Sequence, residues 1–411
     1  MKVMQDNDMD SVKKEIPVLF TEKSACCGCG ACMNICPVKA ISMREDQYGF
    51  MYPQIDDSVC IRCGRCKSVC SFRNEEVKNT PIKTFAAVAN DENLVAKSAS
   101  GGVFAAMAAK IIKDGGAVCG AAFGVDWSVS HIWIDDIRKL ELLQGSKYTQ
   151  SNIGDTYSQA KKLLAEGRKV LYSGTPCQIA GLYGYLGKDY DNLFTVDIIC
   201  HGVPNNRMFR EYIGVLEKNT GGKITSFTFR DKSLGWGSDG RASIEKESGT
   251  VRKKLWKNAS SYTYYFYQGW ICRDSCYKCK YASPHRPADL TVGDYWGIEK
   301  AHPEYLGNKG WNESKGISVI IVNTKQGENL LQEMCDCIDM KPSDFEKAAM
   351  KNSQLSRPSS PGKREEILRL YEEGNWDLLD KRFSENIGWR KYSGLIQSLI
   401  PVSVKRRLKK L

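Results

Sequence analysis

The sequence CCGCGACMNICP covers residues 26–37, and the sequence CIRCGRCKSVC covers residues 60–70. Cys26, Cys29, Cys32 and Cys36 in the first stretch have the same spacing as Cys60, Cys63, Cys66 and Cys70 in the second: two residues separate each of the first three from the next, and three residues precede the fourth. A proline follows the first run at position 37, whereas Ser71 follows the second. This duplication predicts a small domain over residues 20–75 built from two related halves. We expect each half to fold as a βαβ-type unit.

The spacing of the two runs is the signature of bacterial two-cluster ferredoxins, so residues 20–75 are expected to form a bacterial-ferredoxin-like dicluster domain. Three thiolates two residues apart wrap one face of a cubane cluster, and the fourth thiolate of each run reaches the neighbouring cluster. Structural zinc is disfavoured because it takes separate CxxC pairs or mixtures of Cys and His. Cys27 falls between predicted ligands, and we interpret it as a spectator. The spacing therefore predicts two [4Fe-4S] clusters, one held by Cys26, Cys29, Cys32 and Cys70, the other by Cys60, Cys63, Cys66 and Cys36.

Length and cysteine usage narrow the class of protein. A chain of 411 residues has room for this small domain and one large domain or two medium ones. Eight of the 17 cysteines belong to the paired runs, and such clusters need thiolates in a reducing compartment. No signal-peptide pattern opens the chain, and no eighteen consecutive apolar residues occur. We therefore expect a cytoplasmic protein without a membrane span or a disulfide framework.

The formal net charge of +11 does not indicate nucleic-acid binding, because much of it lies in one short tail. Leu395, Ile396, Leu399 and Ile400 stand at helical spacing just before its basic cluster. Such a tail suits peripheral contact with an anionic membrane. A solvated terminus or a helix that docks on a partner is the other interpretation. The basic residues of the tail are Arg390, Lys391, Lys405, Arg406, Arg407, Lys409 and Lys410.

From Thr84 onward, strand-like and helix-like segments alternate, which favours a large mixed α/β domain over residues 84–345. Beyond Gly221, the segments ITSFTFR, ASIEKES and TVRKKLW predict antiparallel strands, so the overall class is α+β. Residues 346–411 are expected to form a helical C-terminal extension that ends in the basic amphipathic tail. The predicted helices cover residues 102–113, 155–166, 176–186, 206–217, 327–339, 363–373 and 376–383.

A third group of cysteines is scattered through the large domain. Cys177 and Cys200 each follow a predicted strand directly, and ligands of open α/β sheets bind at the carboxyl ends of strands. Four thiols of this group would hold one more [4Fe-4S] cluster. The alternative is that they are small buried apolar residues, the usual fate of an isolated cysteine. The group consists of Cys177, Cys200, Cys272, Cys276 and Cys279.

Two loops are candidates for binding an anionic ligand. The segment SASGG at residues 98–102 opens a predicted helix, whose first backbone amides would bind a phosphate. Serine is also a common helix cap and Gly-Gly a common turn, so a structural role explains this segment as well. The segment GSKYTQS at residues 145–151 places Lys147 among hydroxyl groups. This segment would bind an anionic ring or a pyrophosphate. The alternative is that it forms a solvated loop.

Five segments in the same order together resemble the coenzyme F420 hydrogenase/dehydrogenase beta-subunit family, over residues 20–300. They are SGG at 100–102, GSKYTQS at 145–151, SGTPCQIAGL at 173–182, CHGVP at 200–204 and SCYKCKYASPHRPADLTVGDYWG at 275–297. The resemblance implies a flavin-binding large domain that holds FAD and works with iron–sulfur clusters. Members of such families oxidise or reduce a deazaflavin, and some relatives use ferredoxin.

The resemblance also implies the roles of particular residues. Cys177, Cys200, Cys276 and Cys279 would hold a third cluster, with Cys272, His201 or Asp197 as alternative ligands. Lys147 would stabilise the reduced flavin electrostatically, and His201 would donate a proton or serve as a structural histidine. Arg230, Arg241 and Arg286 are candidates for binding an acidic substrate. The expected FAD contacts are Ser100, Gly101, Gly102, Lys147, Tyr148, Thr149, Gly174, Thr175 and Pro176.

The function implied is that of an oxidoreductase. FAD would exchange a hydride with an organic substrate or a deazaflavin, and single electrons would pass through the clusters to or from a ferredoxin-type carrier. The expected partners are that carrier or another redox protein, a small-molecule substrate and a second copy of the chain in a homo-oligomer, with no nucleic acid. One alternative is an electron-transfer subunit of a larger redox complex without its own substrate. Another is an assembly module with structural cysteines, which would bind no flavin.

Overall fold

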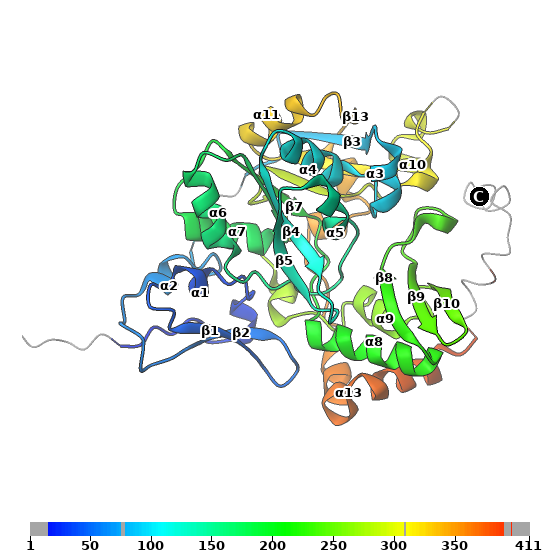
Figure 1. The fold of residues 1–411 in the computed structure, drawn as a ribbon, viewed down its shortest axis with the longest axis horizontal. Helices are drawn as coiled ribbons and strands as arrows, with labels where there is room; N and C mark the ends of the chain where they lie inside the picture. The colour runs from blue at the N-terminus through cyan, green and yellow to red at the C-terminus, as the bar shows by residue number, and fades with distance from the viewer. Residues whose placement is uncertain (1–14, 75–78, 308–309, 390–395, 397–411) are drawn as a thin grey trace, which may run out of the picture.

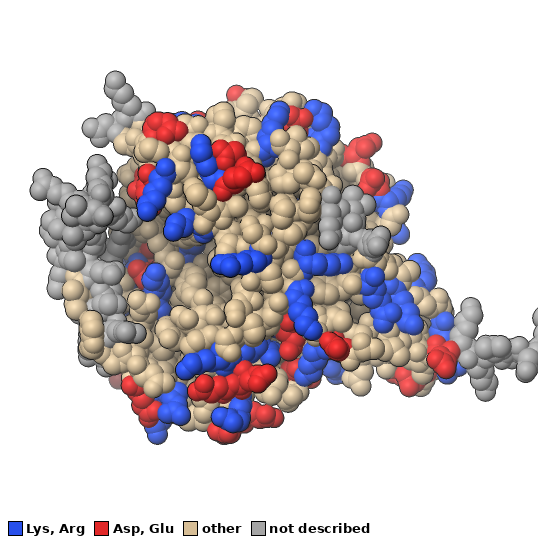
Figure 2. All heavy atoms as spheres, turned by 180° about the vertical axis from the view of Figure 1, so that it is seen from behind, with Lys and Arg blue, Asp and Glu red and all other residues tan. Residues whose placement is uncertain are grey.

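The computed structural model describes residues 15–74, 79–307, 310–389 and 396. A small N-terminal domain, blue in Figure 1, lies at one side of a larger α/β body. Nearly all of the predicted basic tail lies outside the described residues. On the face seen in Figure 2, basic and acidic side chains are interspersed across the surface. Within the described ranges, no helix combines the length and apolar character needed to cross a bilayer.

The small domain consists of two short helices and one hairpin. Strands β1 and β2 pair with each other in antiparallel register, so the expected βαβ halves are wrong. A parallel pair needs a crossover of about a dozen residues or more, whereas only a tight turn separates these strands. In that turn, the Asp46 carboxylate accepts hydrogen bonds from the N–H groups of Tyr48 and Phe50. The elements are α1 (Ala31–Ile35), β1 (Ile41–Glu45), β2 (Met51–Ile55) and α2 (Arg65–Ser68).

The large body is built on an eight-stranded sheet with the order β13-β3-β12-β11-β7-β6-β4-β5. Its centre, β4-β6-β7-β11, is parallel, and the strands on either side join in antiparallel register. This arrangement confirms the mixed α/β class. The strands are β3 (Lys83–Ala89), β4 (Ala117–Phe123), β5 (Val129–Ile134), β6 (Val170–Gly174), β7 (Leu193–Ile198), β11 (Leu290–Asp294), β12 (Ser318–Val322) and β13 (Ile338–Ser343).

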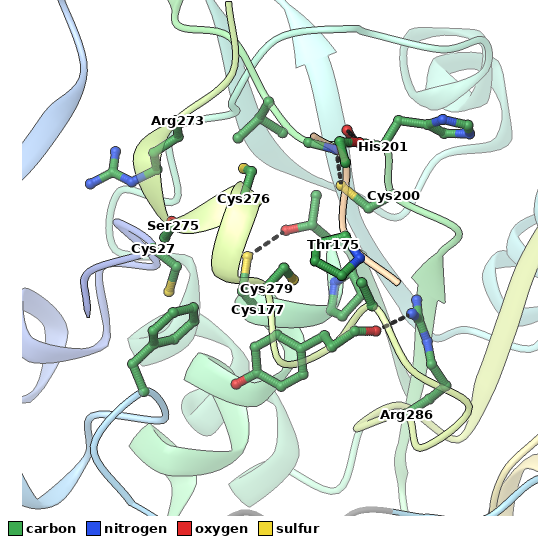
Figure 3. A pocket seen from close by; sticks show the side chains of 18 residues that line it. Cys27, Thr175, Cys177, Cys200, His201, Arg273, Ser275, Cys276, Cys279 and Arg286 are labelled. Atoms are coloured by element: carbon green, nitrogen blue, oxygen red, sulfur yellow. Dashed lines mark hydrogen bonds between the residues drawn. The ribbon is translucent and has the colours of Figure 1, made fainter. Parts of the chain in front are cut away.

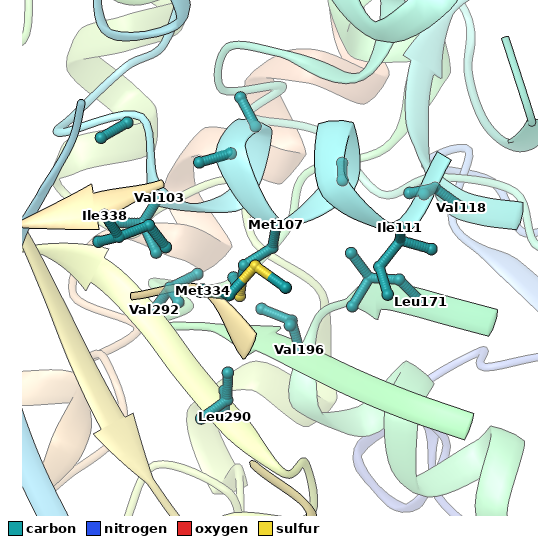
Figure 4. Close-up of a cluster of buried hydrophobic side chains, with 14 of the residues drawn as sticks. Val103, Met107, Ile111, Val118, Leu171, Val196, Leu290, Val292, Met334 and Ile338 are labelled. Atoms are coloured by element: carbon teal, nitrogen blue, oxygen red, sulfur yellow. The ribbon is translucent and has the colours of Figure 1, made fainter. Parts of the chain in front are cut away.

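Helix α4 (Val103–Lys113) provides one wall of the main core. Its buried Met107 and Ile111 point toward the sheet, and Figure 4 shows Met107 above Val196 of β7 and Ile111 beside Leu171 of β6. Removing these apolar side chains from water is the main favourable contribution to folding of this layer. The other helices associated with this sheet are α3 (Glu92–Lys97), α5 (Leu140–Leu143), α6 (Thr156–Ala165), α7 (Pro176–Leu186), α10 (Ile298–Ala301), α11 (Lys325–Glu333) and α12 (Phe345–Ala349).

A second, three-stranded antiparallel sheet packs beside the main one and confirms the strands predicted beyond Gly221. Its aromatic core includes Phe209, Phe229, Tyr262 and Trp376. Helix α13 is kinked at Gly374 and Asn375, where the two predicted C-terminal helices meet. The elements are β8 (Lys223–Thr228), β9 (Gly240–Lys246), β10 (Gly249–Leu255), α8 (Asn206–Thr220), α9 (Ser261–Tyr267) and α13 (Arg364–Ile387).

Candidate functional site

The cysteines of the two runs line two cavities in the small domain. Cys26, Cys29, Cys32 and Cys70 line one, and Cys36, Cys60, Cys63 and Cys66 line the other. The fourth cysteine of each run therefore lies beside the first three of the other run, the arrangement that paired cubane clusters use. The backbone N–H of Ala40 donates to Cys36 Sγ at 3.2 Å. Hydrogen bonds of this kind help to set the reduction potential of a cluster.

The scattered cysteines converge on a third cavity at the junction of the small domain and the large body. Cys177 lies in the first turn of α7, Cys200 lies just beyond β7, and Cys276 and Cys279 lie on the turn around Asp274–Lys278. Because β6 and β7 are parallel neighbours, their carboxyl ends bring Cys177 and Cys200 to the same edge of the sheet. Cys272 is fully buried in the aromatic core instead. The thiols that line this third cavity are those of Cys27, Cys177, Cys200, Cys276 and Cys279 (Figure 3).

The interpretation of Cys27 as a spectator does not fit its position in the structure. Its thiol hydrogen-bonds to the sulfur atoms of Cys177 and Cys29 and so lies between the third cavity and the first cysteine run. No spacing rule predicts this contact, because Cys27 falls outside the CxxC repeat and Cys177 is far away in the sequence. The cavity consequently offers five thiols where a cubane cluster needs four.

The chemistry of these thiols fits an iron–sulfur cluster. Burial raises the pKa of Cys200 and Cys276 well above the usual value, so without metal both side chains would be neutral thiols. A hydrogen bond from Cys27 lowers the pKa of Cys177 and favours its thiolate. Iron deprotonates thiols that bind it. In the described part of the chain, no three Cys, His, Asp or Glu side chains converge on a single-ion site, and a cubane needs no such site because each thiolate binds its own iron.

A larger cavity of about 330 Å³ adjoins the cysteine cavity. This volume is within the range of small-molecule and cofactor sites, about 300–1,000 Å³. Gly101 lies behind its wall, where its N–H donates to the Ser318 hydroxyl, and Pro176 lines the cysteine cavity instead. The structure therefore brings together seven of the nine residues expected to contact FAD. They are Ser100, Gly102, Lys147, Tyr148, Thr149, Gly174 and Thr175.

The two helix N-termini near this cavity differ in their caps. Helix α7 is capped by a reciprocal pair of hydrogen bonds between Thr175 and Gln178, and its first residue, Pro176, has no N–H to donate. Helix α4 begins after Gly102, which has a left-handed φ of 80° and provides no side-chain cap. Gly102, Val103 and Phe104 all line the cavity. The first N–H groups of α4 are thus the backbone donors best placed for a phosphate.

Lys147 adds a positive charge to the wall of the larger cavity. Its Nζ donates to the carbonyl oxygens of Leu142 at 3.0 Å and Gln144 at 2.8 Å. Among the residues that the structure describes, no carboxylate pairs with this ammonium group. Burial lowers the pKa of Lys147 to about 7. An anion bound in the cavity would stabilise the protonated form.

Two histidines line the larger cavity, and one of them was not predicted. His201 lines both cavities, and burial lowers its pKa, which favours a neutral ring near pH 7. His131 on β5 is only 6% exposed, and burial lowers its pKa to about 4. Its Nε2 donates to the Ser173 carbonyl at 2.9 Å, so its buried Nδ1 is an acceptor without a partner. That acceptor at the cavity wall fits a polar ligand.

The three arginines considered for an acidic substrate each contact a carboxylate of the protein. Arg230 pairs with Asp294 at 2.8 Å, Arg241 with Asp231 at 2.9 Å and Arg286 with Asp197 at 2.9 Å. Asp197 therefore pairs with Arg286. Arg286 lines the cysteine cavity, whereas Asp197 does not. It does not fit the role of an alternative cluster ligand.

Together, the cysteine cavities define an iron–sulfur redox protein. Residues 25–74 match the family model for a 4Fe-4S dicluster domain. Residues 167–347 match the model for the C terminus of the coenzyme F420 hydrogenase/dehydrogenase beta subunit. The chain thus combines an N-terminal dicluster domain with the C-terminal region of this beta-subunit family, which confirms the resemblance seen in the sequence.

Among solved structures, similar chains include one from the F420-reducing [NiFe] hydrogenase complex of Methanosarcina barkeri. The two chains are 16% identical with a TM-score of 0.41, and the match covers 76% of this chain and 94% of that one. No curated protein matches the sequence.

Proposed function

We propose that the protein is an oxidoreductase that uses FAD and [4Fe-4S] clusters. It exchanges a hydride between an organic substrate or a deazaflavin and FAD, and it passes single electrons through its clusters to or from a ferredoxin-type carrier. The observation that supports this most directly is the wall shared by the cysteine cavity and the larger cavity. Thr175, Cys200, His201, Gly202 and Val203 line both.

FAD, when bound, supplies the conversion between two-electron and one-electron chemistry. The residues present fit this group. The uncapped N-terminus of α4 would bind its pyrophosphate, and Lys147 would lie near negative charge on its ring. His131 Nδ1 would accept a hydrogen bond from it. Cys177, Cys200, Cys276 and Cys279 would hold the third cluster next to the flavin.

The sites follow one another toward the surface. From the larger cavity the path runs through the cysteine cavity and Cys27 to the cavity of Cys26 and Cys29, and then to that of Cys60 and Cys63. Cys63 is exposed, with exposed Val59 and Ile61 close to it in the sequence. We infer that the carrier exchanges electrons at this outer end.

The proposal is tested by light-driven reduction of the anaerobic protein after reconstitution with FAD and clusters. Electron paramagnetic resonance should detect reduced [4Fe-4S] signals after illumination with a sacrificial donor, in proportion to the bound flavin. The same protein stripped of flavin is the control and should show no such signals. Failure to bind flavin, or reduced flavin beside clusters that stay oxidised, would contradict the proposal.

The affinity for FAD is expected to weaken as the pH rises above about 7, the pKa to which burial lowers Lys147. An anionic cofactor raises this pKa on binding, so binding takes up a proton above about pH 7 and the Kd rises about tenfold per pH unit. Equilibrium titration of FAD between about pH 6 and about pH 9 measures this dependence. Lys147→Gln should flatten it. The exposed Lys218→Gln on α8 should leave it unchanged, and a wild-type Kd independent of pH would refute the role of Lys147.

A further inference from the structure

Arg273 is a buried cation without an anionic partner in the protein. Its side chain is 0% exposed. Across the described ranges, no carboxylate oxygen pairs with its guanidinium group. The group donates instead to the carbonyl of Cys26 at 2.9 Å and to the Gln150 amide oxygen at 3.2 Å. A buried charge is costly unless it is paired, so this one calls for a compensating negative charge.

The surroundings of Arg273 are shaped to hold this cation. The guanidinium carbon lies 4.0 Å from the centre of the Tyr52 ring. On another side is Gly28, with a φ of 67°, where a Cβ would come within 3.0 Å of the guanidinium carbon. A glycine at this position of CCGC therefore leaves room for the side chain. Arg273 thus fixes a contact between the large body and the first cysteine run, 247 residues apart.

Arg273 lies between two sets of predicted cluster ligands. Its Nη2 is 3.9 Å from Cys26 Sγ in the small domain. The same residue lines the cysteine cavity, together with Cys177 and Cys276. In Figure 3 its guanidinium points toward the blue ribbon of the N-terminal domain, while its backbone continues into the turn that carries Cys276. A cubane cluster with four thiolates is an anion, so the two clusters on either side would compensate the positive charge of Arg273.

We propose that Arg273 is an electrostatic junction between the first cluster of the dicluster domain and the third cluster, and that its charge raises the reduction potential of both. Electron transfer between these two clusters moves one electron, with no bond made or broken and no proton transferred. The cation favours the more negative, reduced form of each cluster. The part that concerns the third cluster rests on the proposed function. The part that concerns the first cluster needs only the dicluster domain.

The test is a redox titration of the flavin-free, cluster-loaded full chain, followed by electron paramagnetic resonance. In Arg273→Met, the ratio of reduced to oxidised cluster at a fixed potential should fall about tenfold for both clusters, a shift of about 59 mV for one electron. Arg273→Lys keeps the charge and should recover most of this loss. Iron content and circular dichroism establish that each variant is folded and loaded.

Arg364→Met is the matched control for structural effects. Arg364 binds the same segment, through the Cys272 carbonyl at 3.0 Å and Asp274 at 2.9 Å, but it lines none of the three cysteine cavities. It should leave both potentials unchanged. Unchanged potentials in folded, loaded Arg273→Met would overturn the proposal, as would equal shifts in Arg364→Met. If only the reduction potential of the first cluster shifts, and the chain holds about eight irons, the third cluster is refuted. The effect of Arg273 on the first cluster then still stands.

Discussion

Replacing Cys276 with serine is expected to lower the iron content from about twelve to about eight atoms per chain, because it removes one thiolate of the proposed third cluster. Cys276 lies on the turn that closes the cysteine cavity and lines neither of the cavities of the two N-terminal runs. Those two clusters should stay loaded, and bound FAD should remain. The light-driven reduction of the N-terminal clusters should slow greatly, since the link between them and the flavin is lost. Iron and sulfide analysis together with transient absorbance measures both effects.

Three further cysteine variants decide how the iron content of Cys276→Ser is interpreted. Cys119 is fully buried within β4 and lines none of the three cysteine cavities, so Cys119→Ser should keep about twelve irons. Cys27→Ser tests the fifth thiol and should also keep about twelve. About twelve irons in Cys276→Ser would refute the third cluster. A loss in Cys27→Ser with none in Cys200→Ser would assign Cys27 as the ligand in place of Cys200.

Arg286→Met is expected to destabilise the protein by about 3–5 kcal/mol, because it leaves a buried carboxylate without its partner. The Arg286 and Asp197 side chains are 1% and 0% exposed and lie 2.9 Å apart. Arg286 also donates to the carbonyls of Tyr281 and Ile198 and so joins the cysteine turn to β7. Anaerobic urea unfolding of protein with matched iron content gives the free energy difference from wild type.

The pH dependence of this loss has a definite sign. Burial raises the pKa of Asp197, and removing Arg286 takes away the charge that opposes this effect. A carboxyl whose pKa is higher in the folded than in the unfolded state costs stability above its unfolded pKa, and the cost shrinks as it becomes protonated. The variant should therefore lose less stability at about pH 5 than at about pH 8. Arg286→Met/Asp197→Leu should be more stable than the single variant. Equal losses in the two variants would contradict this explanation.

Local patterns in the sequence predicted much of the fold. The helix expected over residues 176–186 coincides with α7, because Thr175, Pro176 and Gly187 mark both of its ends. The prediction of a helix over residues 327–339 was wrong in its second half, since α11 ends at Glu333 and β13 follows. Strand β13 contains Pro342 and lies at the edge of the sheet, where a proline is tolerated and the strand pattern is weak.

The cysteine runs allowed the ligand sets of the small domain to be predicted, because every residue of that pattern is close in sequence. The contacts that define the rest of the site are long-range. Cys27 meets Cys177, and Arg273 meets Cys26, only after the two parts of the chain have packed together. The carboxylate partners of the arginines have no sequence signal either. Spacing predicts which residues share a loop, but not which loops share a cavity.

The decisive measurement asks whether a flavin and a third cluster are both present in the protein. It is the quantification of iron, acid-labile sulfide and released flavin on a single anaerobically purified sample. We expect about twelve irons, about twelve sulfides and one FAD per chain. About eight irons without flavin would refute both the flavin site and the third cluster and leave a dicluster domain joined to a domain of another function.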